Sequence, residues 1–195
     1  CPDLSIYPAI SRDNTADNWR RKRDIYAASR FYVATPSRWL LRQVEQSIVA
    51  PAIVQGRVIP NGVDLAHFRP GSKQAARASR GLSQEVAILL FVANKARSNI
   101  FKDYRTVERC AVATAAAYHQ RKVILLVLGE EGEPVVFENG EIRFIEFEKD
   151  VNTLAQYYQA ADVYVHAAKS DTFPNTVLEA LACGLPVVAT AVDGI

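Results

Sequence analysis

The second half of this chain alternates short apolar runs with segments of helical periodicity. The runs cover residues 86–93, 122–129, 142–147, 162–168 and 186–192. The first run, VAILLFVA, is apolar throughout, as is typical of a parallel strand that is buried on both faces. Helical patterns near residues 103–119, 151–161 and 175–183 lie between the runs, and a loop rich in Gly and Glu follows the second run. The pattern predicts an α/β fold, a Rossmann-like open parallel sheet with helices on both faces.

The first half of the chain predicts a smaller unit. After an irregular start over residues 1–15, residues 17–30 predict a basic helix, and residues 31–60 predict one β-α-β unit with strands at 31–35 and 57–60. Pro36 and Ser37 supply the start signals of the helix between these strands. The polar segment at 69–83 predicts a linker, or a linker with a short helix. We therefore expect the tail of a first domain over residues 1–68, a linker over 69–83 and a second domain over 84–195.

Composition narrows the class of protein. The 195 residues are 49% hydrophobic and 23% charged, which is ordinary for a globular protein. A net charge of +2 is too small to indicate a nucleic-acid partner, and no apolar run is long enough to span a membrane. Cys1, Cys110 and Cys183 lack metal-ligand spacing, and the last two lie in apolar helical patterns that predict buried free thiols in a reducing cytoplasm. Because the chain lacks methionine and stops directly after a predicted strand, we expect it to be a piece of a larger protein.

Ligands of open α/β sheets bind at the carboxyl ends of the strands, so the loops at 94–102, 129–133 and 169–175 are the candidate sites. The first loop carries Lys95, Arg97 and Lys102 just before a helix that Asp103 would cap. Cations beside the free N–H groups of a helix N-terminus favour a phosphate site. The alternative is a solvated basic loop. The loop contains no glycine, so it is neither a Walker A loop nor a dinucleotide fingerprint.

Two acids bracket the start of the last helix. Pro174 and Asn175 begin this helix, Asp171 lies in the loop before it, and Glu179 lies within it. A helical wheel predicts that the residues facing the sheet are Val177, Leu178, Leu181 and Ala182. Glu179 falls on the opposite side of this wheel, so both acids could line one strand-end cleft. The alternative for Glu179 is a surface acid that the helix dipole favours.

The segment DTFPNTVLEALACGLPVVATAVDGI, residues 171–195, resembles the signature segment of glycosyltransferase family 4, whose enzymes have the GT-B fold. That signature has an acid, seven residues and then a glutamate that leads into a Gly-x-Pro turn. Other segments resemble the family in the same order along the chain, at 33–40, 58–70, 100–107 and 157–170. The resemblance therefore extends over roughly residues 15–195.

The resemblance implies a retaining glycosyltransferase of polysaccharide or glycoconjugate biosynthesis. Such an enzyme moves a sugar from a UDP- or GDP-linked donor to a saccharide or lipid-linked acceptor, with no metal and no other cofactor. Residues 84–195 would bind the nucleotide-sugar, and residues 1–68 would be the C-terminal remnant of the acceptor domain. The resemblance also implies a cytoplasmic protein, at the inner face of the membrane when its acceptor is lipid-linked. We expect this piece to be inactive alone, because most of the acceptor domain would be absent.

Roles for individual residues also follow from the resemblance. Lys102, together with Arg97 or Lys95, would hold the donor diphosphate; Asp171 would approach the transferred sugar; and Glu179 would bind the ribose hydroxyls. The loop before the last helix would add backbone donors for sugar and phosphate, and the loop after residues 142–147 would contact the base. The donor-binding residues that these two loops contribute would be Thr172, Phe173, Pro174, Asn175, Phe147 and Lys149.

The chain departs from the family pattern in ways that keep other hypotheses open. Asp171 replaces the usual glutamate, and Ala93-Asn94 stands where Gly-Arg is common. A non-catalytic GT-B-like nucleotide-binding or interaction module is therefore the main alternative, and an epimerase or phosphorylase that shares the fold is a third. The basic run at residues 19–23 also leaves open a contact with an anionic membrane or, alternatively, a solvated helix face.

Overall fold

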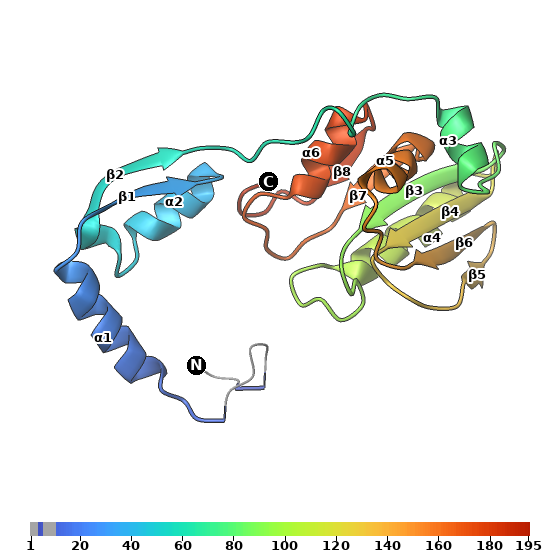
Figure 1. Cartoon of the computed structure of the whole chain (residues 1–195). Helices are drawn as coiled ribbons and strands as arrows, with labels where there is room; N and C mark the ends of the chain where they lie inside the picture. The colour runs from blue at the N-terminus through green and yellow to red at the C-terminus, as the bar shows by residue number, and fades with distance from the viewer. Residues whose placement is uncertain (1–3, 6–10) are drawn as a thin grey trace. The chain divides into compact units, whose positions relative to one another are not determined.

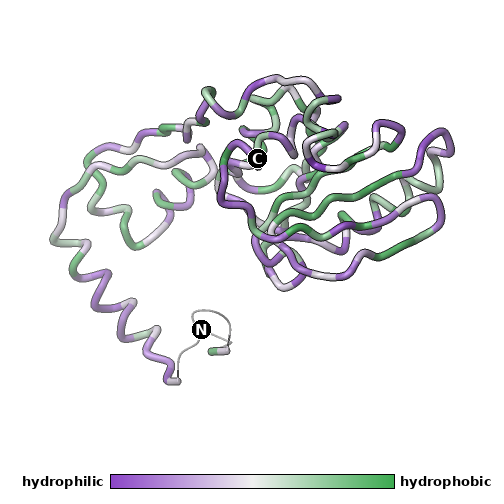
Figure 2. Tube along the Cα trace, turned by 45° about the vertical axis from the view of Figure 1, so that its right-hand side comes forward, coloured by the Kyte–Doolittle hydropathy of each residue, from purple (hydrophilic) through white to green (hydrophobic). Residues whose placement is uncertain are grey.

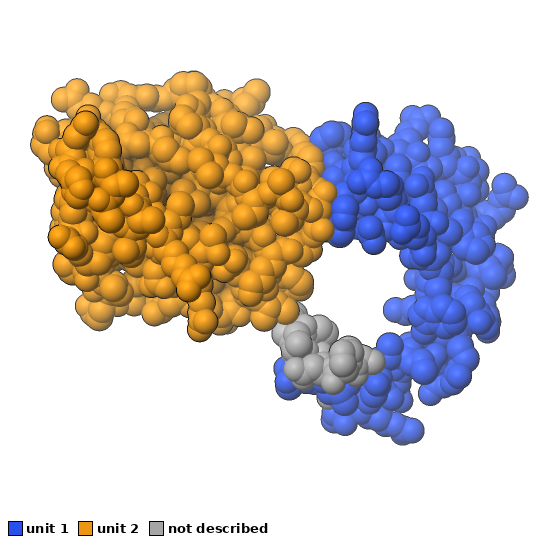
Figure 3. All heavy atoms as spheres, turned by 180° about the vertical axis from the view of Figure 1, so that it is seen from behind, with its two compact units in different colours: residues 1–60 blue, residues 61–195 orange. Residues whose placement is uncertain are grey.

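The computed structural model describes residues 4–5 and 11–195 and forms two compact units, Cys1–Pro60 and Asn61–Ile195 (Figure 3). The division falls earlier in the chain than residue 68, the predicted end of the first domain. Most of the predicted irregular start, Cys1 included, lies outside the described residues.

The first unit contains the predicted β-α-β arrangement, although its second strand covers residues 53–58 and not the predicted 57–60. Strands β1 (Phe31–Thr35) and β2 (Ile53–Val58) pair in parallel, and helix α2 (Arg38–Glu45) and a 3₁₀ turn, η1 (Ala50–Ala52), connect them. The Oγ atom of Ser37 accepts a hydrogen bond from the backbone N–H of Leu40 at 3.2 Å, which confirms the predicted helix start. The basic helix α1 (Thr15–Ala27) has no buried residue and is mostly hydrophilic (Figure 2).

The second unit is an open sheet in the order β5-β6-β4-β3-β7-β8 (Figure 1). The strands β3 (Ala87–Val92), β4 (Val123–Leu128), β6 (Gly140–Ile145), β7 (Val163–His166) and β8 (Val187–Ala189) are parallel, as predicted. An additional edge strand, β5 (Val135–Phe137), lies in the segment predicted to be a Gly/Glu loop and pairs antiparallel with β6. Its three residues are all apolar, but a run of this length is too short to predict a strand.

Helices cover both faces of this sheet. Helix α4 (Tyr104–Ala117) packs its stripe of Val107, Ala111 and Ala115 against one face. Helices α3 (Lys73–Ser79), α5 (Val151–Ala160) and α6 (Asn175–Ala182) contribute to the core on the other face. Alternate side chains of the central strands enter these two cores, which explains why β4 is buried at every position.

One cysteine prediction is wrong. Cys183 is buried, as predicted, but Cys110 is exposed. Cys110 immediately precedes Ala111 of the buried stripe of α4, and one residue turns a helix by about 100°. The side chain of Cys110 therefore points away from the sheet.

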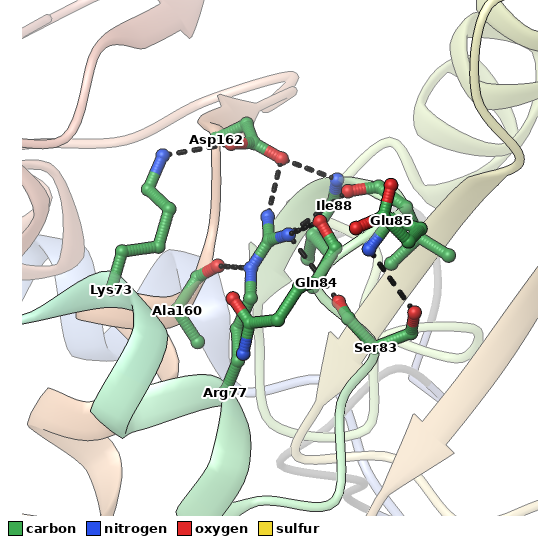
Figure 4. Close-up of polar contacts among 9 residues, drawn as sticks. Lys73, Arg77, Ser83, Gln84, Glu85, Ile88, Ala160 and Asp162 are labelled. Carbon is green, nitrogen blue, oxygen red and sulfur yellow. Dashed lines mark hydrogen bonds and ion pairs between the residues drawn. The ribbon is translucent and has the colours of Figure 1, made fainter.

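Helix α3 lies within the segment predicted as a linker or as a linker with a short helix, and a buried arginine ties it to the sheet (Figure 4). Arg77 is 2% exposed and donates to the backbone oxygens of Ala160, Ser83, Gln84 and Val86. Its Nη2 atom lies 2.7 Å from Asp162 Oδ2, and that oxygen also accepts the N–H of Ile88 at 2.8 Å. The cluster joins α3 and the end of α5 to the starts of β3 and β7, at the amino-terminal edge of the sheet.

The strand order reverses next to β3, because β4 and β6 lie on one side of it and β7 and β8 on the other. The loops that leave β3 and β7 diverge at such a point and open a ligand crevice at the carboxyl edge. Here the two loops are also joined by backbone contacts. The N–H of Asp103 donates to the oxygen of Ala167 at 3.1 Å, and the N–H of Lys169 donates to the oxygen of Phe101 at 2.9 Å.

Candidate functional site

Lys102 and Asp171 form an ion pair where the loops after β3 and β7 meet. The Nζ atom of Lys102 lies 2.6 Å from Asp171 Oδ2, and each side chain is 16% exposed. The backbone contacts between the two loops place these residues, which are 69 positions apart in the chain, next to each other. The site therefore contains a lysine that is already neutralised by the acid predicted to approach the sugar.

The loop around Asp171 is ordered by its own hydrogen bonds. Asp171 Oδ1 accepts the N–H of Phe173 at 3.2 Å, and the backbone oxygen of Asp171 accepts the N–H of Gly194 at 3.0 Å. The hydroxyl of Ser170 donates to Asp193 Oδ2. A carboxylate held in this way has little freedom to reorient, so the loop fixes the position of its acid relative to β7.

Asp103 caps helix α4 beside Lys102, as predicted. Its carboxylate accepts the N–H of Thr106 at 3.3 Å and the Thr106 hydroxyl at 2.7 Å. These bonds, the hydroxyl bond first, lower the pKa of Asp103. The capping acid therefore stays ionised and offsets part of the positive charge of the preceding loop.

Glu179 lies on α6 and faces a cavity of about 240 Å³. The cavity is lined by ends of β3 and β4, by the loop after β6 and by helices α5 and α6, through Val92, Asn94, Leu128, Gly129, Phe147, Glu148, Leu154, Thr176 and Glu179. The buried hydroxyl of Tyr158 donates to Glu179 Oε2 at 2.7 Å. Burial raises the pKa of Glu179, and the bond from Tyr158 only partly opposes this effect. Glu179 is thus a half-buried acid at the edge of this cavity, beside the place where the strand order reverses.

The predicted orientation of α6 is partly wrong. Leu181 is 56% exposed, whereas Ala180 is fully buried and Cys183 is buried beside it. The helix turns its small residue Ala180 toward the sheet, because an alanine lets the helix approach the core closely. Glu179 consequently lies at the flank of the buried face, next to Tyr158, and not on the far side of the helix.

The two cations that compete for the role of second phosphate ligand lie in different surroundings. The guanidinium of Arg97 donates to Glu130 Oε1 at 3.1 Å and to the oxygen of Glu131, and it stacks on the Phe144 ring at 4.7 Å. Lys95 is exposed and lines a hollow of about 360 Å³ that shares Asn94, Gly129 and Phe147 with the Glu179 cavity. Arg97 and Lys102 line another hollow, of about 430 Å³.

The remaining predicted donor-binding residues surround these hollows or lie on exposed loops. Phe147 is 63% exposed and lines both the Glu179 cavity and the hollow beside Lys95. Lys149 is exposed between β6 and α5. Before α6, Thr172 and Asn175 are exposed, and Phe173 and Pro174 are half-buried. The Oδ1 atom of Asn175 accepts a hydrogen bond from Asn61 Nδ2 at 2.9 Å.

Sequence reasoning missed the aromatic row that lies beneath the two acids. Tyr158, Tyr164 and His166 are all buried, with ring centroids 5.7 Å and 6.1 Å apart along the row. Tyr158 contacts Glu179, and His166 Nε2 lies 3.5 Å from Asp171 Oδ2. Tyr164 and His166 are two positions apart in β7, so their side chains lie on the same face of the strand. This pair of polar aromatic residues at the end of a strand was the sequence signal that could have predicted the row.

The part of the chain that the structure describes shows neither a cluster of metal-ligating side chains nor a membrane-spanning helix. Residues 4–5 and 11–195 contain no group of three or more His, Cys, Asp or Glu side chains arranged to hold a metal ion. Over the same residues, no helix is long and apolar enough to cross a membrane.

Comparisons with known proteins identify the family. The family described as glycosyl transferases group 1 matches residues 88–195, which carry all the strands of the larger sheet except the first residue of β3. The chain belongs to this family. A relative named D-inositol 3-phosphate glycosyltransferase 2, from Catenulispora acidiphila, is 38% identical over 156 residues, 72% of this chain and 36% of the relative. The chain thus spans about a third of the length of such curated relatives.

Solved structures of glycosyltransferases share the fold. Sucrose-phosphate synthase from Thermosynechococcus elongatus matches 98% of this chain and 49% of its own, with 25% identity and a TM-score of 0.67. HepE from Anabaena, solved with UDP and glucose, matches 92% of this chain and 50% of its own, with 19% identity and a TM-score of 0.63. These matches confirm the predicted GT-B class.

Proposed function

We propose that the protein to which this chain belongs transfers a sugar from a nucleotide-diphosphate-sugar to an acceptor and retains the anomeric configuration. The observation that carries this proposal is the placement of Lys102, Asp171 and Glu179 at the carboxyl edge of the sheet, beside the point where strand order reverses. All three residues come from the second unit, so this unit would supply the proposed contacts to the donor.

The positions of the charged side chains suit a nucleotide-sugar that lies across the carboxyl edge of the sheet. Glu179 would accept hydrogen bonds from the ribose hydroxyls in its cavity, and the exposed ring of Phe147 would lie against the base. Lys102 would contact the diphosphate and stabilise the negative charge that develops as the bond to the sugar breaks. Asp171 is held 2.6 Å from Lys102, so it would meet the sugar next to that bond.

For the second phosphate ligand we propose Lys95. Arg97 is already bound to Glu130 and Glu131, whereas Lys95 is exposed beside the hollow that adjoins the Glu179 cavity. A flexible lysine can turn toward a phosphate without breaking an ion pair, and its point charge suits that ligand.

The two acids are not arranged as a general acid and base. Asp171 accepts from Lys102, and Glu179 accepts from Tyr158, so both carboxylates already act as hydrogen-bond acceptors. The proposed chemistry therefore depends on binding the donor and on stabilising the leaving diphosphate. Side chains and backbone donors would supply the electrostatic role that a metal has in other transferases.

Donor and acceptor are proposed by class. UDP is the first nucleotide to test, because HepE was solved with UDP and glucose, and GDP is the second. The proposed acceptor is a saccharide or a lipid-linked saccharide in polysaccharide or glycoconjugate biosynthesis. An inositol phosphate belongs in the same panel because of the name that several relatives carry.

The test is a calorimetric titration of the full chain with UDP and with GDP. We expect Lys102→Ala and Glu179→Ala each to weaken binding about tenfold or more, because each removes a hydrogen-bonding charged group. Matched controls at the amino-terminal edge of the sheet, Lys122→Ala and Glu138→Ala, should change affinity by less than about twofold.

Two outcomes would contradict the proposal in different ways. Binding that survives both substitutions unchanged would show that the nucleotide binds elsewhere. Binding at this site, with neither transfer nor donor hydrolysis by the complete enzyme across a panel of nucleotide-sugars, would favour a non-catalytic nucleotide-binding module.

A further inference from the structure

A buried histidine lies behind the Lys102–Asp171 pair. His166 is the last residue of β7, and its side chain is fully buried. Its Nε2 atom lies 3.5 Å from Asp171 Oδ2, the oxygen that Lys102 contacts at 2.6 Å. This Nε2 atom has no hydrogen-bond partner within the described residues, although it points toward a carboxylate.

The neighbours of the ring determine which nitrogen carries the proton. On one side Nδ1 lies 3.4 Å from the hydroxyl of Tyr164, which can donate to it. On the other side Nε2 faces a carboxylate, so a bare Nε2 would set two lone pairs against each other. Burial first, and then the charge of Lys102, lower the pKa of His166 to about 4, although Asp171 acts to raise it. The ring is therefore neutral at physiological pH, with its proton on Nε2.

Lys102 has two competing acceptors under the proposed function. In this structure it neutralises Asp171, but a bound donor would place a diphosphate within its reach. As Lys102 moves toward the phosphate, Oδ2 of Asp171 loses its short hydrogen bond and comes close to additional negative charge. An uncharged hydrogen-bond donor on the other side of the Asp171 carboxylate could replace that bond. Because it carries no positive charge, it would not draw the diphosphate toward Asp171.

We propose that His166 is a positioning residue, whose Nε2–H takes over as the hydrogen-bond donor to Asp171 Oδ2 when Lys102 turns to the donor diphosphate. The inference rests on the proposed function, because it needs a diphosphate at Lys102. Closing the present 3.5 Å separation by a few tenths of an ångström would make an ordinary hydrogen bond. His166 would thus hold the Asp171 carboxylate in its position beside the sugar while Lys102 moves to the diphosphate.

The test is long-range ¹H–¹⁵N NMR of the full chain labelled at its histidines, recorded at pH 8. The chain has three histidines, so His166→Gln assigns the signals of His166 by their loss. We expect the Nε2–H tautomer in the free protein and a downfield shift of this proton when UDP is added to saturation. Lys102→Ala should produce the shift without nucleotide, and Asp171→Asn should abolish it.

The UDP titration and the Lys102→Ala variant together separate failure of this inference from failure of the proposed function. If UDP does not bind, the proposed function is overturned, and the takeover step with it. If UDP binds through Lys102, but the Nε2–H signal shifts neither on addition of UDP nor in Lys102→Ala, only the role of His166 is overturned. An Nδ1–H tautomer in the free protein would also overturn it, whatever UDP does.

Discussion

Glu179 shows how a single residue can cost stability at a site where its charge is proposed to bind the nucleotide. The carboxylate is half-buried, and one hydroxyl, that of Tyr158, donates to it. Burial raises its pKa above the unfolded value, so the folded protein holds a proton that the unfolded chain releases. The contribution of Glu179 to stability therefore becomes less favourable as pH rises from about 4.5 through the folded pKa.

We predict that Glu179→Gln stabilises the protein at pH 7 and weakens nucleotide binding. Glutamine keeps an oxygen for the Tyr158 hydroxyl but removes the buried charge, so the urea midpoint should rise at pH 7 and change less at pH 4. Unfolding can be followed by the near-ultraviolet circular dichroism of the tyrosines, because both tryptophans, Trp19 and Trp39, lie in the first unit. A midpoint that falls at pH 7 would contradict this account of Glu179.

At the scale of elements, one glycine shapes the junction between β4 and the site. Gly129 has a φ of +90°, and a Cβ atom there would lie 2.6 Å from the backbone oxygen of Ala93. The oxygen of Gly129 also accepts the N–H of Lys95 at 2.7 Å. The loops after β3 and β4 therefore depend on a residue without a side chain at this position.

Gly129→Ala should destabilise the second unit by about 1–3 kcal/mol and also weaken UDP binding, because the clash displaces the loop of Lys95. Gly81→Ala is the matched control. Its φ is +64°, but a Cβ atom there would meet nothing within 4 Å, so we expect a cost of about 1–2 kcal/mol and unchanged binding. Equal losses of UDP affinity in the two variants would show that the close approach to Ala93 is unimportant.

The buried side chain of Arg77 connects helix α3 to the sheet. Arg77→Leu should cost about 3–5 kcal/mol in urea unfolding, because it leaves Asp162 and four backbone oxygens without this donor. Lys73 also contacts Asp162, at 2.7 Å, but its side chain is 50% exposed. Lys73→Ala should therefore cost at most about 1 kcal/mol. Similar losses for the two variants would argue against a buried arginine as the anchor.

For the whole molecule, the buried imidazole of His166 gives stability a defined pH dependence. Its folded pKa of about 4 lies below the ordinary value of 6.5, so the unfolded chain binds a proton first on acidification. The contribution of His166 is complete above pH 6.5 and is lost as pH falls toward 4. We expect a loss of about 1–2 kcal/mol between pH 7 and pH 5.

The measurement is the free energy of urea unfolding across that range, compared with the same curve for His166→Gln. The glutamine variant should show a flatter curve, because its side chain does not titrate. Parallel curves would mean that other groups cause the pH dependence.

Much of the fold was predictable from the order of residues. The strands at β3 and β4 were visible because a strand buried on both faces must be apolar at nearly every position. The short edge strand β5 was not visible, since only pairing with β6 defines it. Leu181 was placed on the wrong face because the wheel ranks residues by hydrophobicity, whereas α6 turns the small side chain of Ala180 toward the sheet and leaves Leu181 exposed.

The sequence by itself determined the α/β class and the order of the main strands and helices, because these depend on local periodicity. It also predicted that two acids and a lysine bind the donor, through the motifs that resemble the family. Only the tertiary structure decided which partners these side chains have. The pairing of Lys102 with Asp171, of Tyr158 with Glu179, and of His166 with the back of Asp171 depends on strand order and on backbone contacts between distant loops. Those contacts form only when the sheet brings the ends of β3 and β7 together.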